Sequence, residues 1–258
     1  MVELKLGKQT AGIDAGELVS YQVDGHEFIH QKGSPGWRNA DTEMFPIIGP
    51  TNEAGFVVQV PRGNSILDQH GHLREMDYEL VSQSETIASY RKEYEAGTPV
   101  KNSKYPEKSN RQWLMWPYSF VFEKTFSINE NGLEIVFTVE GERDMPFMLG
   151  YHPAFKIHAQ NPIIMADDRE ITLNEVLAVG SRALQVVDCE SVVLKDEKEL
   201  FITTEGFGHF MCWTEVKNMV CIEPITFYPY AVEQRKLHEG FEHLMEPTQF
   251  KVVLSVRP

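Results

Sequence analysis

The chain of 258 residues carries 38 acidic and 24 basic side chains, giving a formal net charge of −14, which disfavours binding to nucleic acids and to anionic membrane surfaces because both are polyanions. Its three cysteines, an odd number without a C-x-x-C pair, indicate reduced thiols, and neither a secretory leader nor a membrane-length apolar run is visible. We therefore expect a cytoplasmic protein, monomeric or homodimeric, in which residues 1–258 form a single domain, because no linker rich in glycine, serine or proline divides the chain.

Period-two alternation between apolar and polar side chains recurs along the chain and predicts strands. A first hairpin is expected at Asp24-Gly25, which separates ELVSYQV from HEFIHQ. A second is expected at Asn131-Gly132, where a strand containing Phe120 to Phe126 meets one running from Leu133 to Val139, since Asn-Gly favours the positive φ angles of a tight turn. The C-terminal FKVVLSV has the composition of a further strand. Many short strands at close spacing predict an all-β fold, either a sandwich or a barrel-like architecture.

Two segments depart from the strand pattern. Residues 237–246, LHEGFEHLME, are predicted to be helical and to end at Pro247. Residues 95–112 lack both periodicities and carry four basic side chains, namely Lys101, Lys104, Lys108 and Arg111. Polar loops of this length form either the rim of a binding site or a mobile insertion, and the sequence leaves both interpretations open.

Titratable residues occur in three places where strand patterns break: His70, His72 and Arg74 in QHGHLRE, His152 in GYHPAF, and Glu223 in CIEPITFYP. Each has a structural explanation, because a histidine beside a proline can cap a turn and a glutamate at a strand end is usually solvated. Glu223 is the most informative, since it directly follows the apolar run Met219–Ile222. Burial would raise the pKa of such a carboxyl, and perturbed carboxyls are typical of functional sites.

The His70-Gly71-His72 spacing resembles half of a metal site, because residues two apart in a strand point to the same side. A cupin site adds a glutamate a few residues further on and a second motif ending in histidine. Glu75 comes too early, Glu79 too late, and no second motif follows. The sequence also lacks a G-x-S-x-G nucleophile elbow and a G-x-G-x-x-G phosphate loop. We therefore expect no metal and no cofactor.

Taken in order, these segments resemble a known family. The matching segments are AGELVSYQVDGHEFIHQ, MFPIIGP, HGHLR, WPYSFVFEKTF, MPFMLGYHPAF and CIEPITFYP. The set is similar to the aldose 1-epimerase (galactose mutarotase-like) family, in particular to its short bacterial branch related to the lactose-operon mutarotase-like protein. The resemblance implies a large antiparallel β-sandwich. It also implies a cofactor-independent isomerase that interconverts the α and β anomers of an aldose by acid–base ring opening.

The resemblance implies roles for individual residues. Glu223 matches the family's general base and His152 its general acid. His70 matches a histidine that hydrogen-bonds near the ring oxygen, and Arg74 a ligand of sugar hydroxyls. Tyr151 and Trp37 are expected to contact the sugar as well. Trp37 and Trp116 both offer a stacking surface for the apolar face of a sugar, and either can equally belong to the core.

Three features depart from the family pattern and leave the substrate open. His72 stands where the family usually has phenylalanine, which predicts a more polar pocket wall. Pro50 replaces an arginine that often follows FPIxG, and the loop 95–112 is longer than usual. Three alternatives remain. One is a hexose-6-phosphate 1-epimerase, which Arg74 and the basic loop allow although the net charge disfavours it. The second is a non-catalytic carbohydrate-binding or regulatory protein of the same fold, against which the presence of both His152 and Glu223 argues. The third is a metal-dependent cupin-like enzyme, against which the glutamate spacing after His72 argues.

Overall fold

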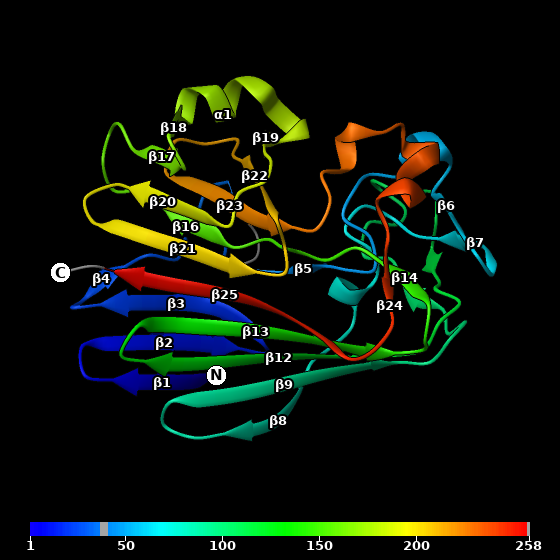
Figure 1. The fold of residues 1–258 in the computed structure, drawn as a ribbon, viewed down its shortest axis with the longest axis horizontal. Coiled ribbons are helices and arrows are strands. Elements are labelled where there is room, and N and C mark those ends of the chain that lie inside the picture. The colour runs from blue at the N-terminus through cyan, green and yellow to red at the C-terminus, as the bar shows by residue number, and fades with distance from the viewer. Residues whose placement is uncertain (37–40, 257–258) are drawn as a thin grey trace.

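A nine-stranded antiparallel sheet forms the larger layer of the molecule in the computed structural model, which describes residues 1–36 and 41–256 (Figure 1). Buried side chains, apolar except for Lys124, occupy every second position of its central strands, so one face of the sheet is buried and the other is in contact with solvent. In spatial order the strands are β18 (Arg169–Thr172), β17 (Ile163–Ala166), β20 (Ser191–Lys195), β21 (Glu199–Glu205), β25 (Thr248–Val256), β13 (Gly132–Gly141), β12 (Phe120–Asn129), β9 (Ile87–Tyr94) and β8 (Glu79–Gln83).

A second, six-stranded sheet covers the buried face. Its strands are β19 (Leu184–Val186), β22 (His209–Trp213), β23 (Met219–Ile225), β15 (Gly150–Tyr151) and β5 (Glu43–Met44), with β16 (Ala154–Lys156) also paired to β23. Aromatic rings join the two layers: Phe137 of β13 lies 5.0 Å from the Tyr151 ring of β15, centroid to centroid, and Phe122 of β12 lies 5.4 Å from Phe45. The predicted all-β fold, a large antiparallel β-sandwich, is confirmed.

Smaller elements flank the sandwich. A four-stranded sheet contains β1 (Val2–Leu6), β2 (Gln9–Asp14), β3 (Glu17–Val23) and β4 (His26–Glu27). Three strand pairs are β6 (Val57–Val60) with β7 (Gly63–Ile66), β10 (Val100–Lys101) with β11 (Trp113–Leu114), and β14 (Met145–Phe147) with β24 (Glu242–Leu244). The helical segments are α1 (Leu173–Val179) and 3-10 turns at Asn52–Ala54, Leu73–Glu75, Gly180–Arg182, Pro229–Ala231 and Gln234–Gly240. None of the helices in these ranges is long and apolar enough to cross a membrane.

Both predicted hairpins are present, one with a shifted turn. Asp24 and Gly25 have positive φ angles of 54° and 77° and connect β3 to β4 as expected. In the second hairpin Asn129 pairs with Gly132, so the turn residues are Glu130 and Asn131 rather than Asn131 and Gly132. Gly132 begins β13 at a φ of 139°, where an added Cβ would meet the backbone oxygen of Leu254 on β25.

The helical prediction for residues 237–246 holds for residues 237–240, as a 3-10 helix, and is wrong for the rest. A 3-10 turn covers Gln234–Gly240, and the following residues form β24, because pairing with β14 outweighs the weak local helical pattern. The sequence analysis missed α1, whose start has a recognisable signal: the Thr172 hydroxyl accepts a hydrogen bond from the Glu175 backbone, and the Glu175 carboxylate accepts one from the Thr172 backbone.

A buried ionic network lies inside the sandwich. Lys124 of β12 is fully buried, and its ammonium contacts the carboxylates of Asp41 (2.7 Å) and Glu43 (2.6 Å). The Tyr151 hydroxyl also donates a hydrogen bond to Asp41, at 2.7 Å. Burial raises the pKa of Asp41 to about 6 although Lys124 opposes the shift. Burial alone would lower the pKa of Lys124, but its two carboxylate partners outweigh burial and raise it.

Candidate active site

Glu223 lies on β23, the strand at the centre of the six-stranded sheet (Figure 1). All seven residues of this strand are buried, as the apolar run before Glu223 predicts, and the Glu223 side chain is only 1% exposed. On one side Glu223 pairs with Met211 of β22. On the other side β23 pairs with two short strands, β15 and β16, and the link between them carries His152.

Because β15 and β16 both pair with β23, His152 lies next to Glu223. Gly150 of β15 pairs with Ile225, and Ala154 of β16 pairs with Cys221. The residues between them run alongside β23, and this register puts His152 opposite Glu223. The His152 backbone N–H donates to the Thr42 carbonyl at 2.8 Å, which fixes this position. His152 Nε2 lies 3.3 Å from Glu223 Oε1. The two side chains therefore form a close pair.

His70 and Arg74 approach the same pair from a different segment. His70 has a φ of 73°, and its Nδ1–H donates to the Ile48 carbonyl at 2.9 Å, which leaves Nε2 with the lone pair. Its ring meets the His152 ring edge-on at 5.4 Å between centroids. Arg74 follows in the 3-10 turn Leu73–Glu75, and its Nε lies 3.9 Å from the Glu75 carboxylate. One wall of the site is thus supplied by the HGHLR segment.

A cavity of about 830 Å³ has four of the six predicted site residues, Glu223, His152, His70 and Arg74, in its wall. This volume lies in the range of small-molecule sites. The wall combines an aromatic side chain, Trp213, with side chains that hydrogen-bond. Its other charged members are Glu53, Lys108, Arg182, Glu215 and Glu233. The cavity can therefore hold a polar ligand of sugar size.

Burial favours the neutral forms of both members of the Glu223–His152 pair. It raises the pKa of Glu223 well above its ordinary value, and it lowers the pKa of His152 to about 3, with Arg74 adding to the shift. The pKa of His70 is also well below its ordinary value, first because of burial and then because of His152 and Arg74. Burial therefore favours the state in which Glu223 holds the titratable proton of the pair and the His152 imidazole is neutral, with 3.3 Å between His152 Nε2 and Glu223 Oε1. Such a pair can donate a proton at one atom and accept one at the other.

The same pair and Cys221 have the spacing of a metal site, since His152, Cys221 and Glu223 bring one ligand atom each within 4.8 Å of one another. Burial raises the pKa of the Cys221 thiol well above its ordinary value, so the thiol stays protonated, whereas metals bind the thiolate. His70 and His72 diverge instead of pairing, because positive φ angles at His70 and Gly71 turn the chain. The arrangement favours proton transfer over metal binding.

Comparisons with known proteins show the family and the fold of the chain. The family model of aldose 1-epimerase matches residues 16–225. The chain belongs to the aldose 1-epimerase family. Among solved structures it is similar to a galactose mutarotase-like protein from Lactobacillus casei (16% identity, 100% of both chains, TM-score 0.78) and to a galactose mutarotase related enzyme from Lactobacillus acidophilus (17% identity, 100% of this chain and 99% of that one, TM-score 0.70). Another similar structure is a galactose mutarotase-like protein from Clostridium acetobutylicum (14% identity, 99% of this chain and 94% of that one, TM-score 0.68). No curated protein matches the sequence.

Two aromatic residues considered as sugar contacts of this aldose 1-epimerase family member, Tyr151 and Trp116, are not brought to the cavity. The Tyr151 side chain is fully buried and points to Asp41, because successive residues of a strand face opposite sides and His152 takes the cavity side. Trp37 lies outside the described residues. Trp116 belongs to the core, where it packs against Tyr118 and Phe241. The sequence analysis missed two aromatic residues of the described wall, Trp213 at the end of β22 and Tyr230 in the 3-10 turn Pro229–Ala231.

The three departures from the family pattern have different consequences. His72 does not make the wall more polar, since it is fully buried between Tyr94 and Phe120, at 4.4 and 5.7 Å between ring centroids. Pro50 does line the cavity. The loop 95–112 contributes to the rim: Lys108 lines the cavity, while the Lys104 ammonium lies 2.9 Å from the Asp68 carboxylate and anchors the loop.

Proposed function

We propose that this protein is an aldose 1-epimerase, a mutarotase that interconverts the α and β anomers of an aldose without a cofactor. The observation that carries the proposal is the 3.3 Å separation of His152 Nε2 and Glu223 Oε1 in the wall of the cavity. The C1 hydroxyl oxygen and the ring oxygen of a pyranose are bonded to the same carbon. Two proton-transfer groups this close together can reach both oxygens at once.

In the proposed reaction Glu223 removes the proton of the C1 hydroxyl while His152 protonates the ring oxygen. The bond between C1 and the ring oxygen breaks, and its electron pair stays on the ring oxygen as the C1 carbonyl forms. The C1–C2 bond then rotates, and the reverse proton transfers close the ring on the other face. For the first step the titratable proton of the pair must lie on His152, so a bound sugar has to shift it there from Glu223. The His70 Nε2 lone pair is proposed to accept a hydrogen bond from a sugar hydroxyl near the ring oxygen, and Arg74 to donate to the oxygens of other hydroxyl groups.

This assignment rests on general acid–base catalysis, in which each positioned group contributes typically ~10²–10⁴-fold. The test is polarimetry on freshly dissolved aldoses, with purified protein against buffer alone. Acceleration of the optical rotation change for at least one aldose is expected. A full panel of aldoses showing only the spontaneous rate, with binding still detectable, would favour the carbohydrate-binding alternative.

A second candidate, a hexose-6-phosphate 1-epimerase, is supported by three cationic side chains in the cavity wall, Arg74, Lys108 and Arg182. Glu53, Glu215 and Glu233 in the same wall oppose it, because carboxylates repel a phosphate. We therefore favour the neutral sugar. Comparing kcat/KM for glucose with that for glucose 6-phosphate distinguishes the two.

A further inference from the structure

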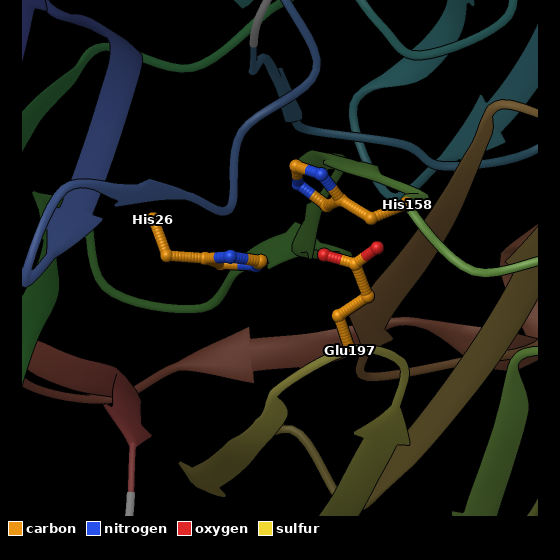
Figure 2. Close-up of side chains that lie close together, drawn as sticks. All are labelled: His26, His158 and Glu197. Carbon is orange, nitrogen blue, oxygen red and sulfur yellow. The ribbon is translucent and has the colours of Figure 1, made fainter.

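A second cluster of titratable side chains lies away from the sugar cavity. His26 of β4, His158 in the segment after β16, and Glu197 in the turn between β20 and β21 converge from three separate parts of the backbone (Figure 2). One ligand atom from each lies within 4.8 Å of the other two. None of the three lines the cavity.

The surrounding hydrogen bonds hold the cluster together. His158 Nε2 donates to the Glu27 carbonyl at 2.8 Å, which fixes the ring proton on Nε2 and leaves the lone pair on Nδ1. Metal-binding histidines usually have this arrangement, in which the second ring nitrogen donates to a carbonyl or carboxylate. The Asp196 carboxylate accepts from the backbone N–H groups of His158 (2.7 Å) and Ala159 (2.6 Å), so the turn that carries Glu197 is tied to the His158 segment.

The two imidazole rings lie side by side at the edge of the molecule's interior. The rings of His26 and His158 lie 4.3 Å apart between centroids, and both are partly buried, whereas Glu197 is exposed and can rotate.

We propose that His26, His158 and Glu197 bind one divalent transition-metal ion, such as Zn²⁺ or Ni²⁺, with the remaining coordination positions filled by water. Two imidazoles and one carboxylate favour these ions over Mg²⁺ and Ca²⁺, which prefer oxygen ligands. Bond lengths of about 2.0–2.2 Å require the ligand atoms to move closer than 4.8 Å, which rotation of the side chains provides. The ion would connect the four-stranded sheet with the β20–β21 turn of the nine-stranded sheet, so it should stabilise the fold without taking part in the reaction.

The test is calorimetric titration of metal-free protein with NiCl₂ and ZnCl₂, together with thermal unfolding with and without the metal. Wild-type protein should bind one equivalent and unfold at a higher temperature with metal. His158→Ala should weaken binding at least 100-fold, and Glu197→Gln, a change at an exposed residue, at least 10-fold. Both should lose the metal-dependent rise in Tm.

Two control variants separate this site from the other histidines. His243→Ala, at an exposed histidine elsewhere, should bind metal as the wild type does. His152→Ala should also bind one equivalent of metal, because the proposed site does not include the active-site group of His152, Cys221 and Glu223. Failure of the wild type to bind, or loss of binding in His152→Ala with retention in His158→Ala, would overturn the proposal.

Discussion

Two groups of buried ionisable side chains differ in how their charges are balanced. In the network of Lys124, Asp41 and Glu43, a fully buried ammonium lies within 2.7 Å of two carboxylates, and the group is sealed inside the sandwich. In the Glu223–His152 pair burial favours the neutral forms, and the pair opens onto the cavity. Burial alone therefore does not identify a functional site. A functional site is indicated by a buried titratable pair that has no counter-charge and that a ligand can reach.

The largest expected effect tests the pair. Glu223→Gln keeps size and hydrogen bonding but removes the proton-transfer group, so turnover should fall by ~10²–10⁴, or about 3–5 kcal/mol of barrier. Because burial already favours the neutral carboxyl, the amide should fold with nearly unchanged stability. Polarimetry and urea unfolding measure the two effects. A folded variant with near-wild-type turnover would show that the base is another group.

The next effect tests the network. Lys124→Met leaves Asp41 and Glu43 buried without their cation, and breaking a buried ion pair typically lowers the free energy of unfolding by about 3–5 kcal/mol. The triple variant Lys124→Met, Asp41→Asn, Glu43→Gln should recover much of this loss in urea unfolding, because neither carboxylate then stays charged without the Lys124 ammonium. A single variant as stable as wild type would mean that the network contributes little.

The sequence predicts those parts of the fold and of the site that lie in long strand patterns, and it fails where a strand is short. The ten-residue alternation of β12 predicts its strand, and the apolar run before Glu223 predicts a buried carboxyl. β15 has only two residues, too few to reveal that Tyr151 faces the core and His152 the cavity. The turn at His70 and Gly71, which sends His72 inward, depends on tertiary contacts. The pairing of β22 with β23 brings Trp213 to the site from another part of the sequence, so its role could not be predicted.

A third buried titratable residue, His72, sharpens the comparison because it has neither a counter-charge nor access to the cavity. Neither ring nitrogen has a hydrogen-bond partner within the described part of the chain, and burial lowers the pKa from 6.5 to about 3. The unfolded chain therefore binds one more proton between these pH values, so His72 makes the fold lose stability as the pH falls below about 6.5. His72→Phe should remove this loss and be stabilised by about 2 kcal/mol more at pH 5 than at pH 7, in urea unfolding at both pH values. Equal stabilisation at the two pH values would contradict the buried neutral state.

The smallest expected effect concerns Arg74, which lines the cavity beside the pair without being placed to transfer a proton. Arg74→Ala should raise KM about 10-fold and leave kcat within a few-fold, because contacts to sugar hydroxyls are present in both the ground state and the transition state. Arg74→Lys, which keeps the charge but loses the planar guanidinium, should give an intermediate KM. Arg74 also contributes to the lowered pKa of His152, so Arg74→Ala should move the acid limb of the kcat/KM profile to higher pH. A fall in kcat with unchanged KM would instead place Arg74 in the chemical step, and the separation between a proton-transfer pair and its binding surroundings would no longer hold.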